Sequence, residues 1–551
     1  MPTRTRGTLA GVAVLVFSFA WFSCSGPEEQ SGAAKTAATS GGDVASIQIL
    51  GINDFEGRLE PTVEDGRKVG GAAYLAAYLD KYAREDPKGT IRVHVGDLVG
   101  ASPLISSYFH DEPTIETTNL MGIDVATVGN HEFDEGGEEM LRLIRGGQRD
   151  DGEEVKGGRN TSDSDFEGAR YPYVSANVVY DSGENVLPPY KVLEREGVKV
   201  GFIGVTTTAA PQVVVPDAVE PFKFLDISNS VNRYAEELQR EGVETIVVLS
   251  HDGNENEDID PPEGEIVAEA KQMSDAVDAI IAGNTEFEID QDIAGKLVLQ
   301  ASGKGLDFAV ADLKVDPQSD DVVGSSGKVV PVYDDRVEPD PEVQALVEES
   351  RERIAPIANR EIGKAAEDIT ADANEAGESA LGDLISDAQR EYADADFAFM
   401  NPGGIRADIP AGPVTYEDLF TTQPFDNGLT RVEMTGAQIE DLLEQQFELE
   451  VVTILQISGL EYAYDESKPK GERVTEITLP DGDPLDPSAT YTVAANSFLL
   501  TGGDGFTVFK AAKNAETLGG DLEALVQYVE NLPQPFTAPD PGEERRITSN
   551  R

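Results

Sequence analysis

Short apolar runs that lead into polar segments are the leading pattern in the first half of the chain. The runs at 45–50, 91–95, 125–128, 245–249 and 277–281 are rich in Val and Ile. Such runs predict buried β-strands. Because ligands of open α/β sheets collect at the carboxyl ends of strands, we expect the polar segments that follow to converge in space. The candidate site residues in these segments include Asp54, Glu56, Asp97, Asn130, His131, Asp134, His251, Asn284 and Glu286.

The alternation of strand-like and helix-like segments outlines two domains. It predicts a mixed α/β domain over 45–333, interrupted by an acidic, glycine-rich surface insertion at 145–168. A helical pattern at 342–357 predicts a linker and connector helix over 334–360. A second α/β domain is expected over 361–547. Within it, the apolar pattern predicts a helix at 377–393 and strands at 430–434, 474–479 and 491–495.

The N-terminus has the features of an export signal. Two arginines precede an apolar run at 9–22, which is short for a membrane span and typical of a signal peptide. We therefore expect a signal peptide over 1–24, a small-residue, acidic tether over 25–44, and an extracellular or cell-surface protein. Cys24, the only cysteine, is a candidate lipidation site, but its neighbours also suit ordinary cleavage. A lipid anchor and free secretion both stay open.

Composition limits the partners. The chain has 551 residues, enough for two or three domains with full cores. The 103 acidic and 43 basic side chains give a formal charge of −60, which opposes binding to nucleic acid and to anionic membranes. Such acidity suits a hydrated protein in strong salt or simply an acidic, solvated surface. We take the charge as a sign of environment and expect a monomer.

The polar segments contain the residue types that a two-metal phosphoesterase needs. A phosphate ester is cleaved by an oxygen nucleophile in line with the leaving oxygen, and two cations that share a carboxylate can hold both groups. Asp97 is the natural bridging carboxylate, Asp54 would serve one metal, and Asn130 and His251 would serve the other. A single Asp at a strand end is more often a helix cap than a ligand. Five strand ends with such residues make that alternative weak.

His131 and Asp134 are candidates for the proton chemistry. They lie three positions apart, in a tight turn or a first helical turn. The carboxylate can therefore orient the imidazole, as a general acid for the leaving oxygen or as a stabiliser of developing charge. We predict that this pair is catalytic.

Several motifs are shared with one family. In the first half they are the segments 53–55, 96–98, 129–134 and 250–251, and in the second half 378–383, 401–406, 423–425, 496–498 and 501–506. They resemble, in order, the metallophosphoesterase domain and the nucleotide-binding domain of the secreted 5′-nucleotidases, a family also known for UDP-sugar hydrolase and 2′,3′-cyclic phosphodiesterase activities. The resemblance spans about 47–510, and so many ordered motifs make it specific.

The resemblance implies a fold and a substrate site. The expected fold is α/β: a metallophosphoesterase mixed β-sandwich flanked by helices, a linker helix and a second α/β substrate-binding domain. Phe425 and Phe498 would sandwich a nucleobase, since stacking accepts any base. Arg406 would hold the phosphate or ribose side, and Asp504 would bind sugar hydroxyls. The substrate-binding residues implied are Asn401, Gly403, Gly404, Arg406, Phe425, Phe498 and Asp504.

The chain departs from the family at three metal positions. The family's Asp-x-His is Asp54-Phe55-Glu56 here, and its Gly-His-x-His, with Gln at times in last place, is Gly-Asn-Thr-Glu at 283–286. These changes make the expected shell rich in oxygen. Because carboxylates suit harder cations, we expect two ions of Mn²⁺, Mg²⁺ or Ca²⁺ in preference to Zn²⁺. The expected ligands are Asp54, Glu56, Asp97, Asn130, His251, Asn284 and Glu286.

The leading hypothesis is an exported, metal-dependent phosphoesterase that hydrolyses nucleotides or nucleotide sugars with water activated by two metals. The alternative is a weakened or inactive relative that binds nucleotides or acts as a surface interaction protein. A purely structural surface protein fits less well with the paired aromatic residues and Arg406. Nucleoside monophosphates, nucleotide sugars and cyclic nucleotides all suit a base sandwich beside two metals, so the substrate stays open.

Overall fold

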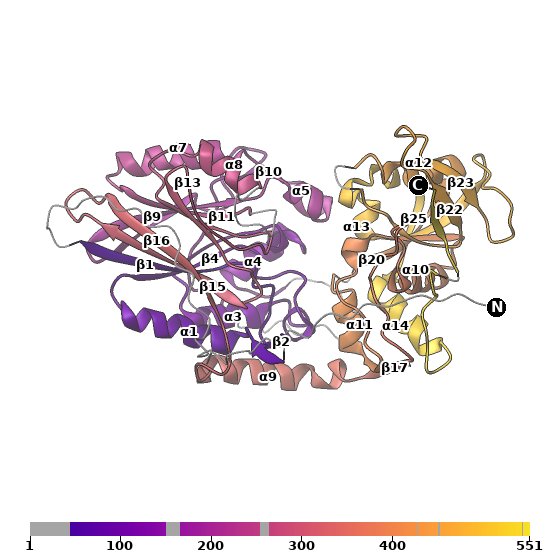
Figure 1. The fold of residues 1–551 in the computed structure, drawn as a ribbon, viewed down its shortest axis with the longest axis horizontal. Helices are drawn as coiled ribbons and strands as arrows, with labels where there is room; N and C mark the ends of the chain where they lie inside the picture. Colours follow the sequence, from indigo (N-terminus) through magenta and orange to yellow (C-terminus); the bar gives the residue numbers. More distant parts are fainter. Residues whose placement is uncertain are drawn as a thin grey trace, which may run out of the picture. The chain divides into compact units, whose positions relative to one another are not determined.

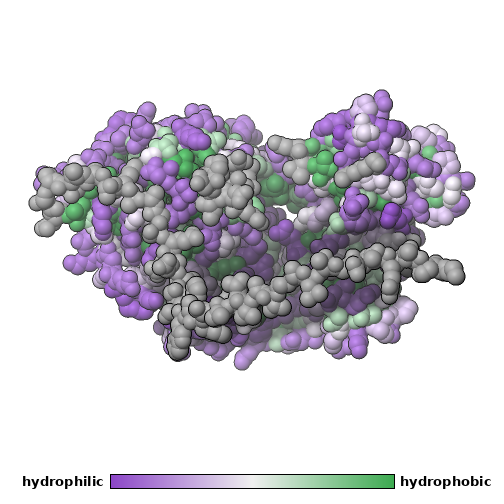
Figure 2. Space-filling view, in the orientation of Figure 1, coloured by the Kyte–Doolittle hydropathy of each residue, from purple (hydrophilic) through white to green (hydrophobic). Residues whose placement is uncertain are grey.

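The fold is known from a computed structural model, which describes residues 44–550 except 65, 150–165, 254–263, 426, 450–451 and 543. The predicted signal peptide, Cys24, nearly all of the tether and most of the predicted insertion lie outside the described residues. Among the helices of the described part, none has the length and apolar character that a membrane crossing needs. Figure 2 shows a largely hydrophilic face, in keeping with the acidic composition.

Two six-stranded sheets form the N-terminal half of the described chain (Figure 1). The first contains β1 (Ala45–Ile52), β4 (Thr90–Val95), β5 (Val125–Thr127), β6 (Tyr173–Val174), β15 (Asp307–Val315) and β16 (Val322–Pro331), in the order β16-β15-β1-β4-β5-β6. The second contains β8 (Tyr190–Arg195), β9 (Val198–Thr206), β11 (Thr245–His251), β12 (Ala279–Ala282), β13 (Ile289–Ile293) and β14 (Lys296–Gln300), in the order β13-β14-β12-β11-β9-β8. All five predicted strands are therefore present.

An apolar layer joins the two sheets. Ile49 and Val93 of the first sheet pack with Phe202, Leu249 and Ile281 of the second, and all five are fully buried. On the outer face of the second sheet lie α7 (Ile227–Arg240) and α8 (Glu265–Gln272), and on that of the first lies α1 (Ala72–Glu85). Strands buried on both faces carry nearly continuous apolar runs, as these do. The predicted β-sandwich flanked by helices is confirmed.

Shorter elements connect the strands of this half. They are β2 (Thr62–Glu64), β3 (Arg67–Val69), α2 (Leu104–Ser107), α3 (Glu112–Met121), η1 (His131–Phe133), α4 (Gly137–Arg145), β7 (Val178–Tyr180), α5 (Ala210–Val213), α6 (Pro216–Val219) and β10 (Phe222–Phe224). The helix predicted at 342–357 is α9 (Pro341–Ala358), capped by Asp340, whose side chain accepts hydrogen bonds from two backbone amides of the first turn.

A five-stranded sheet, in the order β21-β18-β24-β20-β25, forms the centre of the C-terminal half. Its strands are β18 (Phe397–Met400), β20 (Gly428–Thr435), β21 (Gln456–Ser458), β24 (Thr490–Asn496) and β25 (Lys513–Gly520). The helices are α10 (Ala380–Ala393), η2 (Pro402–Gly404), α11 (Tyr416–Thr422), α12 (Gly436–Gln445), α13 (Ser497–Leu500), η3 (Gly503–Gly505), η4 (Thr507–Ala511) and α14 (Asp521–Asn531). The remaining strands are β17 (Glu361–Ala365), β19 (Gly412–Thr415), β22 (Glu461–Tyr464), β23 (Val474–Thr478) and β26 (Ile547–Ser549).

The start of α10 differs from the sequence prediction. The predicted helix at 377–393 begins only at Ala380, because Gly377 has a left-handed φ of 86° and Ser379 caps the helix. The Ser379 hydroxyl accepts a hydrogen bond from the Gly382 amide at 3.1 Å. The three predicted strands of this half are observed as β20, β23 and β24.

Asp383 on α10 is expected to make stability depend on pH. Burial raises the pKa of its carboxyl to about 8, although Arg546 lies 3.6 Å away. A raised pKa in the folded state means that the free energy of unfolding falls as pH rises from about 4 to 8. Because asparagine does not ionise, Asp383→Asn avoids this fall in the free energy of unfolding. The variant is expected to be more stable than the parent at pH 8 by on the order of 2 kcal/mol. Urea unfolding at pH 5 and pH 8 measures the difference.

Asp387→Asn is the matched control. The Asp387 carboxylate accepts hydrogen bonds from Arg546 at 2.9 and 2.8 Å, so its loss should destabilise the protein. An Asp383→Asn protein whose stability changes with pH as the parent's does would contradict the assignment.

Candidate active site

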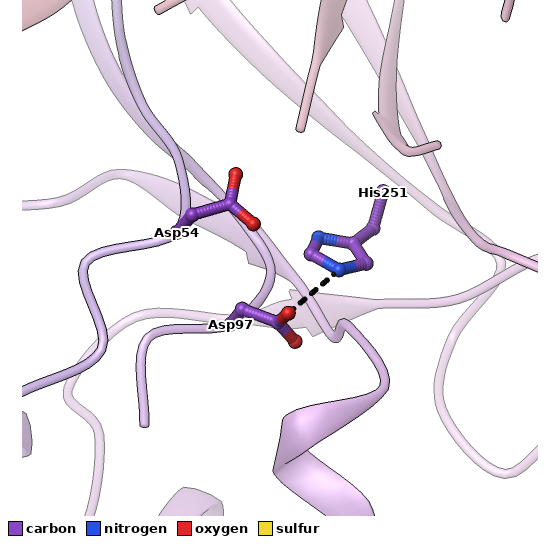
Figure 3. A group of neighbouring side chains, drawn as sticks. All are labelled: Asp54, Asp97 and His251. Atoms are coloured by element: carbon purple, nitrogen blue, oxygen red, sulfur yellow. Dashed lines mark ion pairs between the residues drawn. The ribbon is translucent and has the colours of Figure 1, made fainter. Parts of the chain in front are cut away.

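Asp54, Asp97 and His251 form a buried cluster, with one ligand atom of each within 4.8 Å of the others (Figure 3). Asp54 follows β1, Asp97 follows β4 and His251 is the last residue of β11, so both sheets contribute. Asp97 Oδ2 lies 3.0 Å from His251 Nε2. Two carboxylates and an imidazole, buried together, are a typical donor set for a divalent transition-metal ion. A divalent ion therefore fits this cluster.

Asn130 joins the cluster, and a backbone contact orients the imidazole. Asn130 Oδ1 lies 3.2 Å from His251 Nε2. His251 Nδ1 lies 2.8 Å from the carbonyl oxygen of Val95, which leaves Nε2 facing the carboxylates. Such outer contacts fix the ring orientation of ligating histidines. The convergence predicted from the strand ends is therefore observed for Asp54, Asp97, Asn130 and His251.

The charges in the cluster are mutually dependent. Burial raises the pKa of Asp54 to about 7, although the charge of His251 opposes the rise. Burial alone would lower the pKa of His251, but the carboxylate of Asp97 outweighs it and raises this pKa to about 10. A ligating imidazole must be neutral, so an ion bound here takes the place of the proton on His251.

Glu132 organises the loops that carry the cluster, a role that the sequence analysis missed. Its carboxylate accepts hydrogen bonds from the backbone amides of Asp97 at 3.0 Å, Leu98 at 2.8 Å and Gly129 at 2.5 Å. Burial raises the pKa of Glu132 to about 7. An acidic residue inside the Gly129–Asp134 turn, between the two members of the predicted His131–Asp134 pair, was the available signal.

The predicted pair of His131 and Asp134 is present. His131 begins η1 and Asp134 directly follows its last residue, and His131 Nδ1 lies 2.7 Å from Asp134 Oδ2. The amide of His131 also donates to Asp97 Oδ1 at 2.8 Å, which ties the pair to the cluster. Although burial opposes it, the charges of Asp134 and Asp97 raise the pKa of His131 well above its ordinary value. His131 is therefore able to carry a proton at neutral pH.

Glu56, Asn284 and Glu286, which replace the family's histidines, contact other protein groups near the cluster. The backbone amide of Asn284 donates to both carboxylate oxygens of Asp54, at 3.0 Å each. Glu286 accepts a hydrogen bond from Lys304 Nζ at 2.7 Å. Glu56 faces Arg58, with 3.5 Å between Oε2 and Nη2. Lys304 and Arg58 were not singled out from the sequence, and whether Glu56, Asn284 and Glu286 bind metal stays a prediction.

The site loops carry strained backbone. Five non-glycine residues of the site have a left-handed φ between 47° and 80°. This conformation is uncommon for side chains other than Asn, Asp and Gly, and it concentrates at functional sites. The residues are Asp54, Glu56, Asp97, Asn284 and Glu286.

A cavity of about 510 Å³ opens beside His131 and Asn130. The ring of Phe425 lies 6.4 Å from the ring of His131, and the guanidinium of Arg406 lies 6.0 Å from the centre of the Phe425 ring. The structure thus brings the predicted acid and the whole predicted substrate site to one cavity. Its lining includes Asn130, His131, Asp134, Asn401, Gly403, Gly404, Arg406, Phe425, Phe498 and Asp504.

Comparison with known proteins identifies the family. Residues 361–511 match the family described as 5′-nucleotidase, C-terminal domain. The chain is 35% identical to "Cell wall protein Lmo0130" of Listeria monocytogenes serovar 1/2a, over 90% of this chain and 68% of that protein. It is also 35% identical to "Endonuclease YhcR" of Bacillus subtilis strain 168, over 94% of this chain but only 42% of that longer protein.

A solved structure shares the fold. The 5′-nucleotidase precursor from Thermus thermophilus is 26% identical, with a TM-score of 0.72 over 92% of this chain and 99% of that chain. The predicted resemblance in sequence is therefore matched by the arrangement of the strands and helices. The chain belongs to the 5′-nucleotidase family.

Proposed function

We propose that the protein is an exported, metal-dependent phosphoesterase that hydrolyses nucleotides. The observation that carries the proposal is the shared cavity, in which the His131–Asp134 pair meets Arg406 and two phenylalanine rings, next to the buried Asp–His cluster. The family's metal dependence and the similarity to a solved 5′-nucleotidase support it. We propose further that export uses the segment 1–24, with Cys24 as a candidate lipid attachment site.

Each side chain has a role in this mechanism. Asp54, Asp97, Asn130 and His251 would hold a divalent ion. Such an ion, when bound, polarises the phosphoryl oxygens and makes water a better nucleophile. His131 donates its proton to the leaving oxygen, and Asp134 holds the ring in place through the contact at Nδ1.

The finer assignment of the metals follows the sequence analysis. It expects a second ion, with Glu56, Asn284 and Glu286 as further ligands, and a preference for Mn²⁺, Mg²⁺ or Ca²⁺ over Zn²⁺ because oxygen donors suit harder cations. Metal analysis of the purified protein, followed by assays of AMP and UDP-glucose hydrolysis with each ion, tests both points. Absence of metal and of turnover with every ion would favour the alternative, a nucleotide-binding protein without activity.

The relative YhcR is named an endonuclease, so cleavage of nucleic acid is a second candidate activity. The formal charge of −60 opposes this for the present chain, because a polyanion gains affinity mainly from basic side chains that displace its counterions. We therefore propose single nucleotides or nucleotide sugars as substrates.

Phe498 is expected to govern the binding of the base. Phe498→Ala should raise the KM for AMP about 10-fold, because stacking on one ring contributes about 1–3 kcal/mol per base. Hydrolysis of p-nitrophenyl phosphate, which carries no nucleobase, should change little, since the ring lines the cavity and is not part of the buried cluster. Steady-state kinetics on both substrates measure the split.

The control is Phe498→Tyr, which keeps an aromatic face and should behave as the parent does. Equal losses on AMP and on p-nitrophenyl phosphate in the alanine variant would count against the base platform.

A further inference from the structure

Glu56 and Glu286 stand out because basic side chains face both of them. Lys304 Nζ lies 2.7 Å from each carboxylate oxygen of Glu286. Arg58 Nη2 lies 3.5 Å from Glu56 Oε2, and the Glu56 side chain is only 6% exposed. Burial raises the pKa of Glu56, and the charge of Lys304 opposes that rise. The four groups form one small cluster of opposite charges, which we call the Lys304 cluster.

The loop of Lys304 is held against the metal-binding cluster. The Lys304 amide donates to the carbonyl oxygen of Asp54 at 2.7 Å. Gly303, with a φ of 86°, runs so close that an added Cβ would lie 3.2 Å from Asp54 Cβ and 3.6 Å from Glu286 Cγ. Lys304 itself has a left-handed φ of 55°. This constrained backbone places the lysine at the Glu286 side of Asp54.

The two clusters differ in the charge that they offer an ion. The cationic groups that act on Asp54 and Asp97 are histidines: His251 acts on both carboxylates and His131 on Asp97. His251 can give up its proton to a metal. Glu56 and Glu286 face a lysine and an arginine, so their two negative charges are already balanced. A divalent ion would have to displace an ammonium that is tethered nearby, and tethering gives the ammonium a high effective concentration. The second position therefore disfavours an ion.

We propose that the ammonium of Lys304 takes the place of the second divalent ion, so that the protein binds one ion tightly and holds the second position with its own cation. This inference rests on the proposed function, because it concerns the same site, and it replaces the second ion that the sequence predicts there. It gives the two substituted glutamates a role other than ligation: they anchor Lys304 and Arg58.

The position of the two cations suggests what they contribute. Arg58 and Lys304 line a cavity of about 240 Å³ together with Arg406. Three cationic side chains around one cavity offer N–H donors to an anionic oxygen, although Glu56 and Glu286 balance part of their charge. Lys304 therefore offers a substrate phosphate the positive charge that a second ion would otherwise supply.

The test counts ions. The full chain is stripped of metal, dialysed against Mn²⁺, and its manganese measured per chain by mass spectrometry. We expect about one Mn²⁺ in the parent and about two in Lys304→Met, which is similar in length but uncharged. Lys304→Arg, which keeps the charge, and Lys314→Met, which changes an exposed lysine on β15, should both stay at one.

If Lys304→Met is too unstable to be stripped of metal, a second measurement replaces the ion count. The melting temperature of Lys304→Met should rise further across a Mn²⁺ titration than that of the parent, because an ion that binds only the folded state stabilises it. Adding Glu56→Gln and Glu286→Gln to Lys304→Met should abolish the extra ion. Two ions in the parent, or no gain in Lys304→Met, would overturn the inference. If the parent binds about one Mn²⁺ and Lys304→Met about two, but the parent does not hydrolyse AMP, the proposed function is overturned and this inference stands.

Discussion

Asp97→Asn is expected to abolish both metal binding and nucleotide hydrolysis. Asp97 lies 3.0 Å from His251 and is one of only two carboxylates in the buried cluster of the described residues. Loss of its charge also weakens the acceptor of the His131 backbone amide, which donates to Asp97 Oδ1 at 2.8 Å. Removing a residue that only orients a metal ligand already lowers metal affinity about 10–100-fold, so removing a direct ligand should lower it more. Isothermal titration with Mn²⁺ and AMP assays measure the two losses.

Asp335→Asn is the control for this change. Asp335 pairs with Arg67 on an exposed surface, with side chains that are 57% and 42% exposed, so metal affinity should not move. Parent-like Mn²⁺ affinity in Asp97→Asn would show that the metal binds elsewhere.

His131→Ala is expected to reduce turnover about 10²–10⁴-fold, the usual range for a positioned proton donor. The metal content should hardly change, because only the backbone amide of His131 contacts Asp97, and alanine keeps that amide. The loss should be larger for AMP, whose leaving group is basic, than for p-nitrophenyl phosphate, whose leaving group needs little protonation. Comparison of kcat on the two substrates, with metal analysis of the same samples, tests the role.

Asp134→Asn gives the graded control for His131. It keeps the shape of the side chain near Nδ1 but removes the charge that raises the pKa of His131. The loss in kcat should be smaller than for His131→Ala and should depend on pH. Parent-like turnover in His131→Ala would exclude this histidine from the mechanism.

The strands and most of the metal-binding cluster could be predicted from the sequence. Runs buried on both faces must be apolar throughout, so β1, β4, β5, β11 and β12 are visible as short Val- and Ile-rich segments with polar ends. The spacing of His131 and Asp134 fixed their contact, because a single helical turn brings positions three apart together.

The partners of the substituted residues could not be predicted in the same way. Lys304 pairs with Glu286, which lies 18 positions earlier in the chain, before β13 and β14. No periodicity links two residues that meet only through a tertiary fold. Glu132 likewise acts on backbone amides, and a sequence pattern of side chains does not reveal which amides need an acceptor.

The apolar layer between the two sheets also bears on which ions the proposed metal site would distinguish. Asp54 and Asp97 follow strands of one sheet and His251 ends a strand of the other, so the thickness of that layer affects the distance between these ligand atoms. Packed interiors compress little, and a methylene more or less at Val93 or Leu249 would move one sheet against the other. We therefore expect the ion selectivity of the proposed site to depend also on side chains that do not touch the ion.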